Sequence, residues 1–171
     1  MIFQGFKESI LTKKFEKELN LLESSLTSNT KKISSVGILT TEALSSTQNL
    51  QAQVERILGV KNAKIYSFRK YHKTNEVSYK HFSEKDINWK GEYTEPSFHS
   101  FLEEPFDLLI GYFDSSNLYL EIAVLQSDAT FKVGFSDIRE ALFDITISEN
   151  TLHVDAFLQE LKKYLVILEK L

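Results

Sequence analysis

Apolar residues recur at helical spacing near both ends of the chain and gather into short continuous runs between them. Near the start, apolar residues recur at near-helical spacing with Lys and Glu in between, which predicts a helix over residues 6–26. They are Leu11, Phe15, Leu19, Leu22 and Leu26. Near the end, a second amphipathic pattern predicts a helix over residues 154–168.

The first two apolar runs between these helices predict strands. They cover residues 36–39 and 64–68, and they flank a helical stripe that includes Val54 and Leu58. Gly59 follows this stripe, at the place where a helix commonly ends in left-handed backbone. A strand, a helix and a strand with short joints form one right-handed crossover unit of a parallel sheet.

A second strand-helix-strand unit covers residues 106–135, and its helix is apolar on almost every side, which predicts deep burial. A further strand over residues 143–147 follows without room for a full helix. We therefore predict a single α/β domain over residues 1–171. Its architecture is a three-layer sandwich with a mostly parallel, about five-stranded Rossmann-like sheet, plus N- and C-terminal helices, the first within residues 1–30.

The connections are less regular than the elements they join. Residues 69–95 are predicted to form an irregular basic insertion with one short strand near residues 77–82, and loops of this length are often functional. Residues 40–44 are predicted to be a loop. Asn150 or Thr151 is the expected N-cap of the last helix.

Composition excludes several kinds of chemistry. The chain has no cysteine, which rules out disulfides, thiolate catalysis and cysteine-based metal sites. Its four histidines share no metal-ligand spacing, and neither glycine-rich phosphate motif nor a Gly-x-Ser-x-Gly motif occurs, so we expect no metal and no cofactor. No apolar run approaches the roughly 18 residues that span a bilayer, and none at the start suits a signal peptide, which predicts a cytoplasmic protein.

Charge is uneven along the chain. Residues 61–90 carry a net charge of +5, whereas residues 91–171 carry −10. Arg69, Lys70 and Lys73 are the candidate contacts for an anionic partner. Aromatic residues lie among the basic ones, a combination that suits single-stranded RNA. They are Tyr66, Phe68, Tyr71, Tyr79, Phe82 and Trp89.

Ligands of open α/β sheets bind outside the carboxyl ends of the strands, so the residues that end or follow predicted strands are the candidate ligand-binding residues. They are Thr40, Thr41, Tyr112, Asp114, Ser115, Phe135 and Asp137. An acid or base role falls most naturally to Asp114. Helix capping is the simpler explanation for threonine and aspartate at such positions.

The whole chain resembles a family of short, uncharacterised cytosolic proteins of Bacteroidota, which implies a bacterial protein but no activity. The matching segments are Gly5-Phe6-Lys7, Trp89-Lys90-Gly91, Phe106-Asp107-Leu108-Leu109-Ile110, Ala129-Thr130-Phe131-Lys132-Val133-Gly134 and Tyr164-Leu165-Val166-Ile167-Leu168.

A shorter stretch is similar in layout to the amino-terminal half of heptosyltransferase-type glycosyltransferases. The similarity lies in Phe106-Asp107, the apolar helix after it and Val133-Gly134-Phe135. In that family the donor nucleotide-sugar is held mainly by a second, carboxyl-terminal domain, and this chain ends before any such domain. The resemblance therefore implies the fold and argues against transferase activity.

The preferred functional prediction is a non-catalytic binding or interaction module. Its expected partner is another protein, or a second copy bound through the N-terminal helix. One alternative is a small enzyme or enzyme subunit that acts on a sugar-like or phosphorylated metabolite. The other is an RNA-binding protein that uses the basic insertion.

Overall fold

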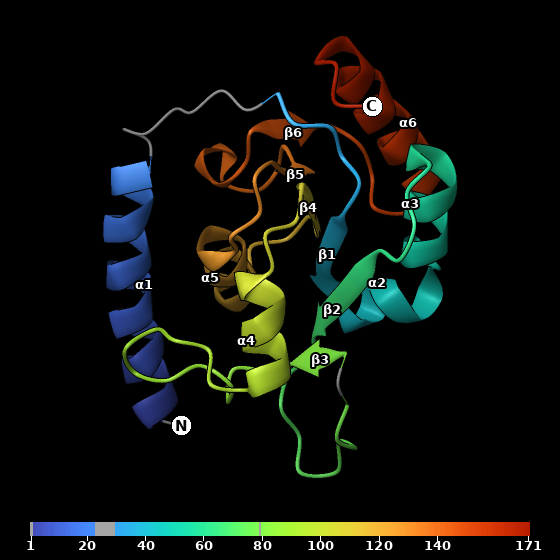
Figure 1. Cartoon of the computed structure of the whole chain (residues 1–171). Coiled ribbons are helices and arrows are strands. Elements are labelled where there is room, and N and C mark those ends of the chain that lie inside the picture. Colours follow the sequence, from blue (N-terminus) through green and yellow to red (C-terminus); the bar gives the residue numbers. More distant parts are fainter. Residues whose placement is uncertain (1, 23–29, 79) are drawn as a thin grey trace.

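The structure, a computed structural model, describes residues 2–22, 30–78 and 80–171, and its centre is a six-stranded sheet in which all strands are parallel (Figure 1). The strands are β1 (Val36–Thr41), β2 (Lys64–Phe68), β3 (His81–Phe82), β4 (Leu108–Tyr112), β5 (Lys132–Phe135) and β6 (Ile145–Ile147). Their spatial order is β3-β2-β1-β4-β5-β6, the doubly wound order of Rossmann-like sheets. The predicted α/β fold is confirmed, with one strand more than expected.

Helices cover both faces of the sheet. They are α1 (Ile2–Leu22), α2 (Glu42–Thr47), α3 (Leu50–Leu58), α4 (Pro96–Glu103), α5 (Leu118–Gln126) and α6 (Val154–Ile167), with a 3-10 turn η1 (Glu140–Leu142). Helices α3 and α6 pack against each other on one face, while α1 packs against α5 and η1 on the other (Figure 1). This gives the predicted three layers.

Helix α1 begins at Ile2, earlier than predicted. Of its predicted stripe, Leu11, Phe15 and Leu19 are buried, whereas Leu22 is exposed. The predicted end of this helix, residues 23–26, lies outside the described residues. Because the buried stripe starts only at Leu11, the first turns of α1 extend past the core.

Two local predictions were wrong. Residues 40–44 are not a loop, since the Thr41 hydroxyl accepts a hydrogen bond from the Leu44 N–H and starts α2 directly at the end of β1. Helix α6 begins after His153 without a side-chain cap, so neither predicted cap residue serves there.

The insertion at residues 69–95 is more ordered than predicted, because β3 forms inside it and pairs with β2. A further antiparallel bridge joins Ile87 to Tyr93. The buried carboxylate of Glu84 accepts hydrogen bonds from the Tyr71 N–H, at 3.0 Å for the shorter one. The β2–β3 pairing joins the insertion to the carboxyl edge of the sheet, and the other two contacts order the insertion internally.

Candidate functional site

The carboxyl ends of β1 and β4 meet where the strand order reverses, and side chains fill this switch point. Thr40 and Tyr112 are fully buried, and the Thr40 hydroxyl donates to the Tyr112 carbonyl at 2.7 Å. The Tyr112 ring packs edge-on against Phe135 and Phe157, with centroids 5.0 and 5.1 Å away. The place where a doubly wound sheet ordinarily binds its ligand is therefore occupied by the protein itself.

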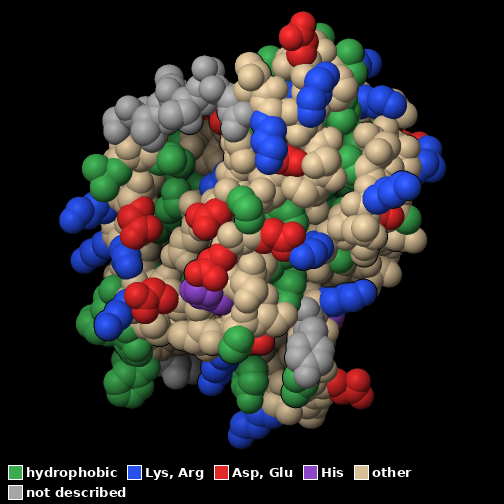
Figure 2. Space-filling model, viewed as in Figure 1, with side chains coloured by type: hydrophobic (Ala, Val, Ile, Leu, Met, Phe, Trp, Pro, Cys, Tyr) green, Lys and Arg blue, Asp and Glu red, His purple; other side chains and the backbone are tan. Residues whose placement is uncertain are grey.

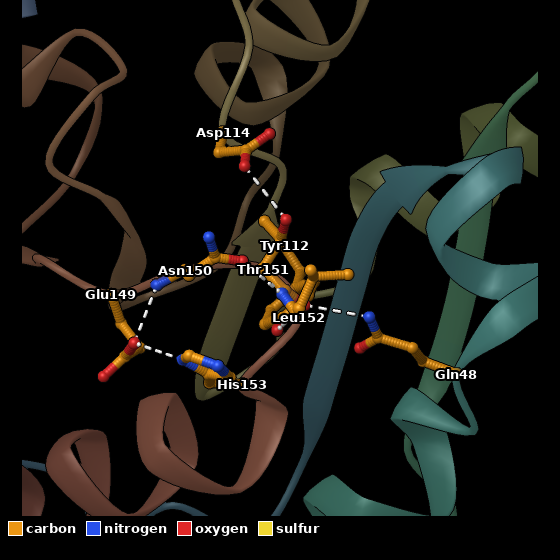
Figure 3. A network of polar contacts seen from close by, with 8 residues as sticks. All are labelled: Gln48, Tyr112, Asp114, Glu149, Asn150, Thr151, Leu152 and His153. Atoms are coloured by element: carbon orange, nitrogen blue, oxygen red, sulfur yellow. Dashed lines mark hydrogen bonds and ion pairs between the residues drawn. The ribbon is translucent and has the colours of Figure 1, made fainter.

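The turn before α6, residues 149–153, covers this point through a polar network (Figure 3). The Tyr112 hydroxyl and the Gln48 amide both donate to the Thr151 carbonyl, at 2.8 and 2.9 Å. The Thr151 hydroxyl donates to Asp114 at 2.9 Å. Burial, with help from the negative charge of Asp114, raises the pKa of Tyr112, so its hydroxyl remains a proton donor.

The other predicted ligand residues have ordinary structural roles or face solvent. Thr41 caps α2, and Ser115 donates to Asp114 at 3.4 Å. Asp137 is exposed after β5 and forms no hydrogen bond with the other candidates in the described part of the chain. The structure thus joins Thr40, Tyr112, Phe135, Asp114 and Ser115, but as packing rather than as an open site.

The Tyr112 hydroxyl predicts a measurable effect of its own. Tyr112→Phe should lower the free energy of unfolding by about 1 kcal/mol, because it deletes one buried hydrogen bond while the ring still fills its place. Hydrogen exchange should accelerate at residues 150–153 and remain unchanged in β5. Unchanged exchange in that turn would show that the hydroxyl does not hold it.

Of the predicted anion contacts, one is already paired within the chain. The Arg69 guanidinium lies 3.9 Å from the Glu42 carboxylate and donates to the Glu76 carbonyl at 2.7 Å. Lys70 and Lys73 are exposed. The charge available to a partner from this trio is therefore that of the two lysines.

Sequence reasoning missed an open groove on the α3 face of β2 and β3. In-register pairing puts His81 beside Ser67, Ser67 beside Thr40, and Thr40 beside Tyr112, so four polar side chains form a row across four strands. Helices and the turn at residues 149–153 cover the half of this row that contains Thr40 and Tyr112. The described part of the β2–β3 link contains no helix, which leaves Ser67 and His81 on the floor of a groove of about 550 Å³.

The walls of this groove are polar. Helix α2 and the first turn of α3 form one side, and Lys80 lies at another. The lining residues are Glu42, Ser45, Ser46, Thr47, Gln48, Asn49, Leu50, Gln51, Ile65, Ser67, Lys80 and His81. One signal for this place in the sequence was Ser67, a small polar residue between Tyr66 and Phe68 in a predicted strand.

A second exposed feature lies where α1 begins. Ile2, Phe3 and Phe6 on α1 and Trp89 on the insertion are 87%, 79%, 62% and 46% exposed. We call these four side chains the α1 apolar patch. Figure 2 shows hydrophobic side chains gathered at that end of the molecule. The rings of Phe6 and Trp89 touch, with centroids 5.9 Å apart.

Comparison with known proteins gives a family but no activity. The model of a family of unknown function (DUF6913) matches residues 7–168. The chain belongs to this family. No curated protein and no solved structure matches it. The match includes the whole groove and the Figure 3 network, whereas Ile2, Phe3 and Phe6 precede it.

Several predictions about this DUF6913 member remain predictions. The comparisons give no source organism and no glycosyltransferase, so the bacterial origin and the transferase-like layout are untested. Among the described residues, none of the helices is long and apolar enough to cross a membrane. Within the same residues, no group of three or more His, Cys, Asp or Glu side chains could hold a metal ion.

Proposed function

We propose that this protein is a non-catalytic interaction module that self-associates through the α1 apolar patch. The observation that carries the proposal is the exposure of four large apolar side chains in one place. Taking about 200 Å² for each such side chain when fully exposed, the patch leaves roughly 500 Å² of apolar surface open. That is at the upper end for a monomer and suits the centre of a standard interface.

The patch is held in place by the protein's own contacts. The Lys7 ammonium donates to the carbonyls of Glu84 and Ile87, which fastens the first turns of α1 to the insertion. About two helical turns further on, the Lys14 ammonium donates to the Lys90 carbonyl. A surface that is already ordered loses little conformational entropy on binding, so more of its apolar contact energy contributes to affinity.

A second copy of the chain is the partner that fits best. A two-fold contact needs only one self-complementary patch, and apolar side chains complement themselves. Two lysines of α1 near the patch are used within the chain: Lys7 and Lys14 donate to carbonyls, and Lys14 also lies 3.7 Å from Glu18. Two facing patches would therefore bring little unpaired like charge from these two lysines together.

The two alternative functions receive less support from the geometry. The enzyme alternative placed its chemistry at the strand ends, where Tyr112 and its neighbours fill the space. RNA stacking needs exposed rings, yet Tyr66 and Phe82 are buried and only Tyr71 and Trp89 are open. Tyr79, also counted for that alternative, lies outside the described residues.

The test is the mass of the protein in solution. Sedimentation equilibrium should show a mass that rises toward twice the chain mass with concentration. The double variant Phe3→Glu/Phe6→Glu should remain monomeric, because two carboxylates would be buried in the contact. Its thermal stability should be unchanged, since both positions are exposed.

Ile167→Glu is the matched control, because Ile167 is an equally exposed apolar residue on α6, at the far side of the molecule from the start of α1 (Figure 1). It should associate like the wild type. A wild-type protein that stays monomeric at every concentration would refute the proposal, as would a double variant that associates normally.

A further inference from the structure

We infer that the groove beside β2 and β3 binds a small hydroxylated phosphate ester, the chemistry of a sugar phosphate. This is a ligand site separate from the α1 apolar patch. A volume of about 550 Å³ falls within the usual range for small-molecule sites. The groove exists because the described part of the β2–β3 link, residues 69–78 and 80, projects from the carboxyl edge of the sheet instead of crossing its face (Figure 1).

The floor of the groove offers hydrogen bonds that the protein does not use. Ser67 is only 3% exposed, and its hydroxyl bonds to no residue that the structure describes. The Ser67 hydroxyl is open to the groove, so a ligand oxygen placed against it would form a hydrogen bond. In the same lining, Gln48 Oε1 is buried and accepts no hydrogen bond from the described residues, so a ligand hydroxyl would satisfy it. Beside Ser67, the Nδ1 atom of His81 forms a hydrogen bond with the Ser78 hydroxyl at 2.8 Å, which leaves the Nε2 atom for a ligand.

The walls favour an anionic group on that ligand. The first turn of α3 forms part of the lining, and the positive end of a helix dipole attracts phosphate. Lys80 adds a full positive charge. The one carboxylate in the lining, Glu42, lies 3.9 Å from the Arg69 guanidinium, which offsets its repulsion of an anion.

The polar side chains around this anion position specify hydroxyl groups rather than a bare ion. Ser45, Ser46 and Gln51 line the groove beside Ser67, and their oxygens can accept hydrogen bonds from ligand hydroxyls. Burial and the nearby Arg69 lower the pKa of His81, so its imidazole is neutral near pH 7 and presents a hydrogen bond without charge. A ligand with hydroxyl groups at one end and a phosphate at the other matches this arrangement.

In the experiment, the full chain is titrated with glucose 6-phosphate, ribose 5-phosphate, glucose and inorganic phosphate. Binding is measured by calorimetry and by amide NMR shifts. We expect the two sugar phosphates to bind and to shift residues 49–51, 67 and 81. Ser67→Ala and Lys80→Gln should each weaken that binding about tenfold, the effect of losing one ligand hydrogen bond or charge contact. Lys73→Gln, on the same link but outside the groove lining, is the matched control and should bind like the wild type.

Three outcomes would overturn the inference. The first is the absence of any shift in the groove with either sugar phosphate at millimolar concentration. The second is an equal response to inorganic phosphate, which would show an anion site without hydroxyl recognition. The third is sugar-phosphate binding that survives both Ser67→Ala and Lys80→Gln. None of them alters the expected mass of the Phe3→Glu/Phe6→Glu variant, so the two proposals fail independently.

Discussion

Replacing Asp107 by alanine is expected to lower the free energy of unfolding by about 2–4 kcal/mol, a large share of the 5–15 kcal/mol that stabilises a typical domain. The Asp107 side chain is 2% exposed at the start of β4. One carboxylate oxygen accepts from the N–H groups of Ser34 and Ser35, at 2.9 and 3.0 Å. The other lies 2.6 Å from the Lys31 ammonium.

This carboxylate joins the segment before β1 to the start of β4, the two central strands. Burial alone would raise the pKa of Asp107, but the Lys31 ammonium and the hydrogen bonds from Ser34 and Ser35 outweigh it and hold that pKa well below its usual range. Alanine would remove the charged acceptor of several donors at once, which is why the expected loss exceeds that of an ordinary hydrogen bond.

Urea unfolding followed by circular dichroism measures the loss, and Asp155→Ala is the matched control. Asp155 pairs with Arg56 at 2.8 Å in solvent, so its removal should cost less than about 1 kcal/mol. The Asp107 contribution is present above the unfolded pKa of about 4 and is lost as pH falls through the lower folded value. The difference in free energy of unfolding between wild type and Asp107→Ala should therefore narrow below pH 4. Equal losses of stability in Asp107→Ala and Asp155→Ala would contradict this account.

Periodicity in the sequence predicted the layers because periodicity reports burial. Leu11, Phe15 and Leu19 recur at helical spacing because one side of α1 faces the core. Helix α5 lacks a polar side because it is buried almost all round, from Tyr119 to Val124. Such patterns need no knowledge of which elements are neighbours, so they gave the fold class correctly.

The site depended on neighbours, which local patterns do not encode. Tyr112 and Thr151 are 39 residues apart, and only the fold brings the second onto the first and closes the crevice. Ser67 became a groove residue because β3 pairs with β2 without an intervening helix. In the sequence, Thr40 and Ser67 look alike, yet the structure covers one and leaves the other at an opening.

Lys132 should make the protein more stable as pH rises above 8, the reverse of what a lysine in an ion pair would do. Its ammonium donates to the carbonyls of Val124 and Leu125 at the end of α5, at 2.7 and 3.4 Å. Burial lowers the pKa of Lys132 to about 8, against partial compensation by Asp144 and Asp128. Between that value and about 10.5, the unfolded chain binds more protons at this residue than the folded one, so unfolding becomes less favourable as pH rises.

Lys132→Met isolates this effect, because the variant keeps every tyrosine and carboxylate that also titrates. Urea unfolding at pH 7, 8, 9 and 10 gives the free energy of unfolding of each protein. The value for the wild type should rise relative to that of the variant by about 1 kcal/mol per pH unit, or roughly 2–3 kcal/mol in all. The direction matters more than the size, since a lysine stabilised by an ion pair would lose stability over the same range. A difference between wild type and variant that stays flat from pH 7 to 10 would mean that the Lys132 ammonium is solvated, and that the end of α5 does not depend on it.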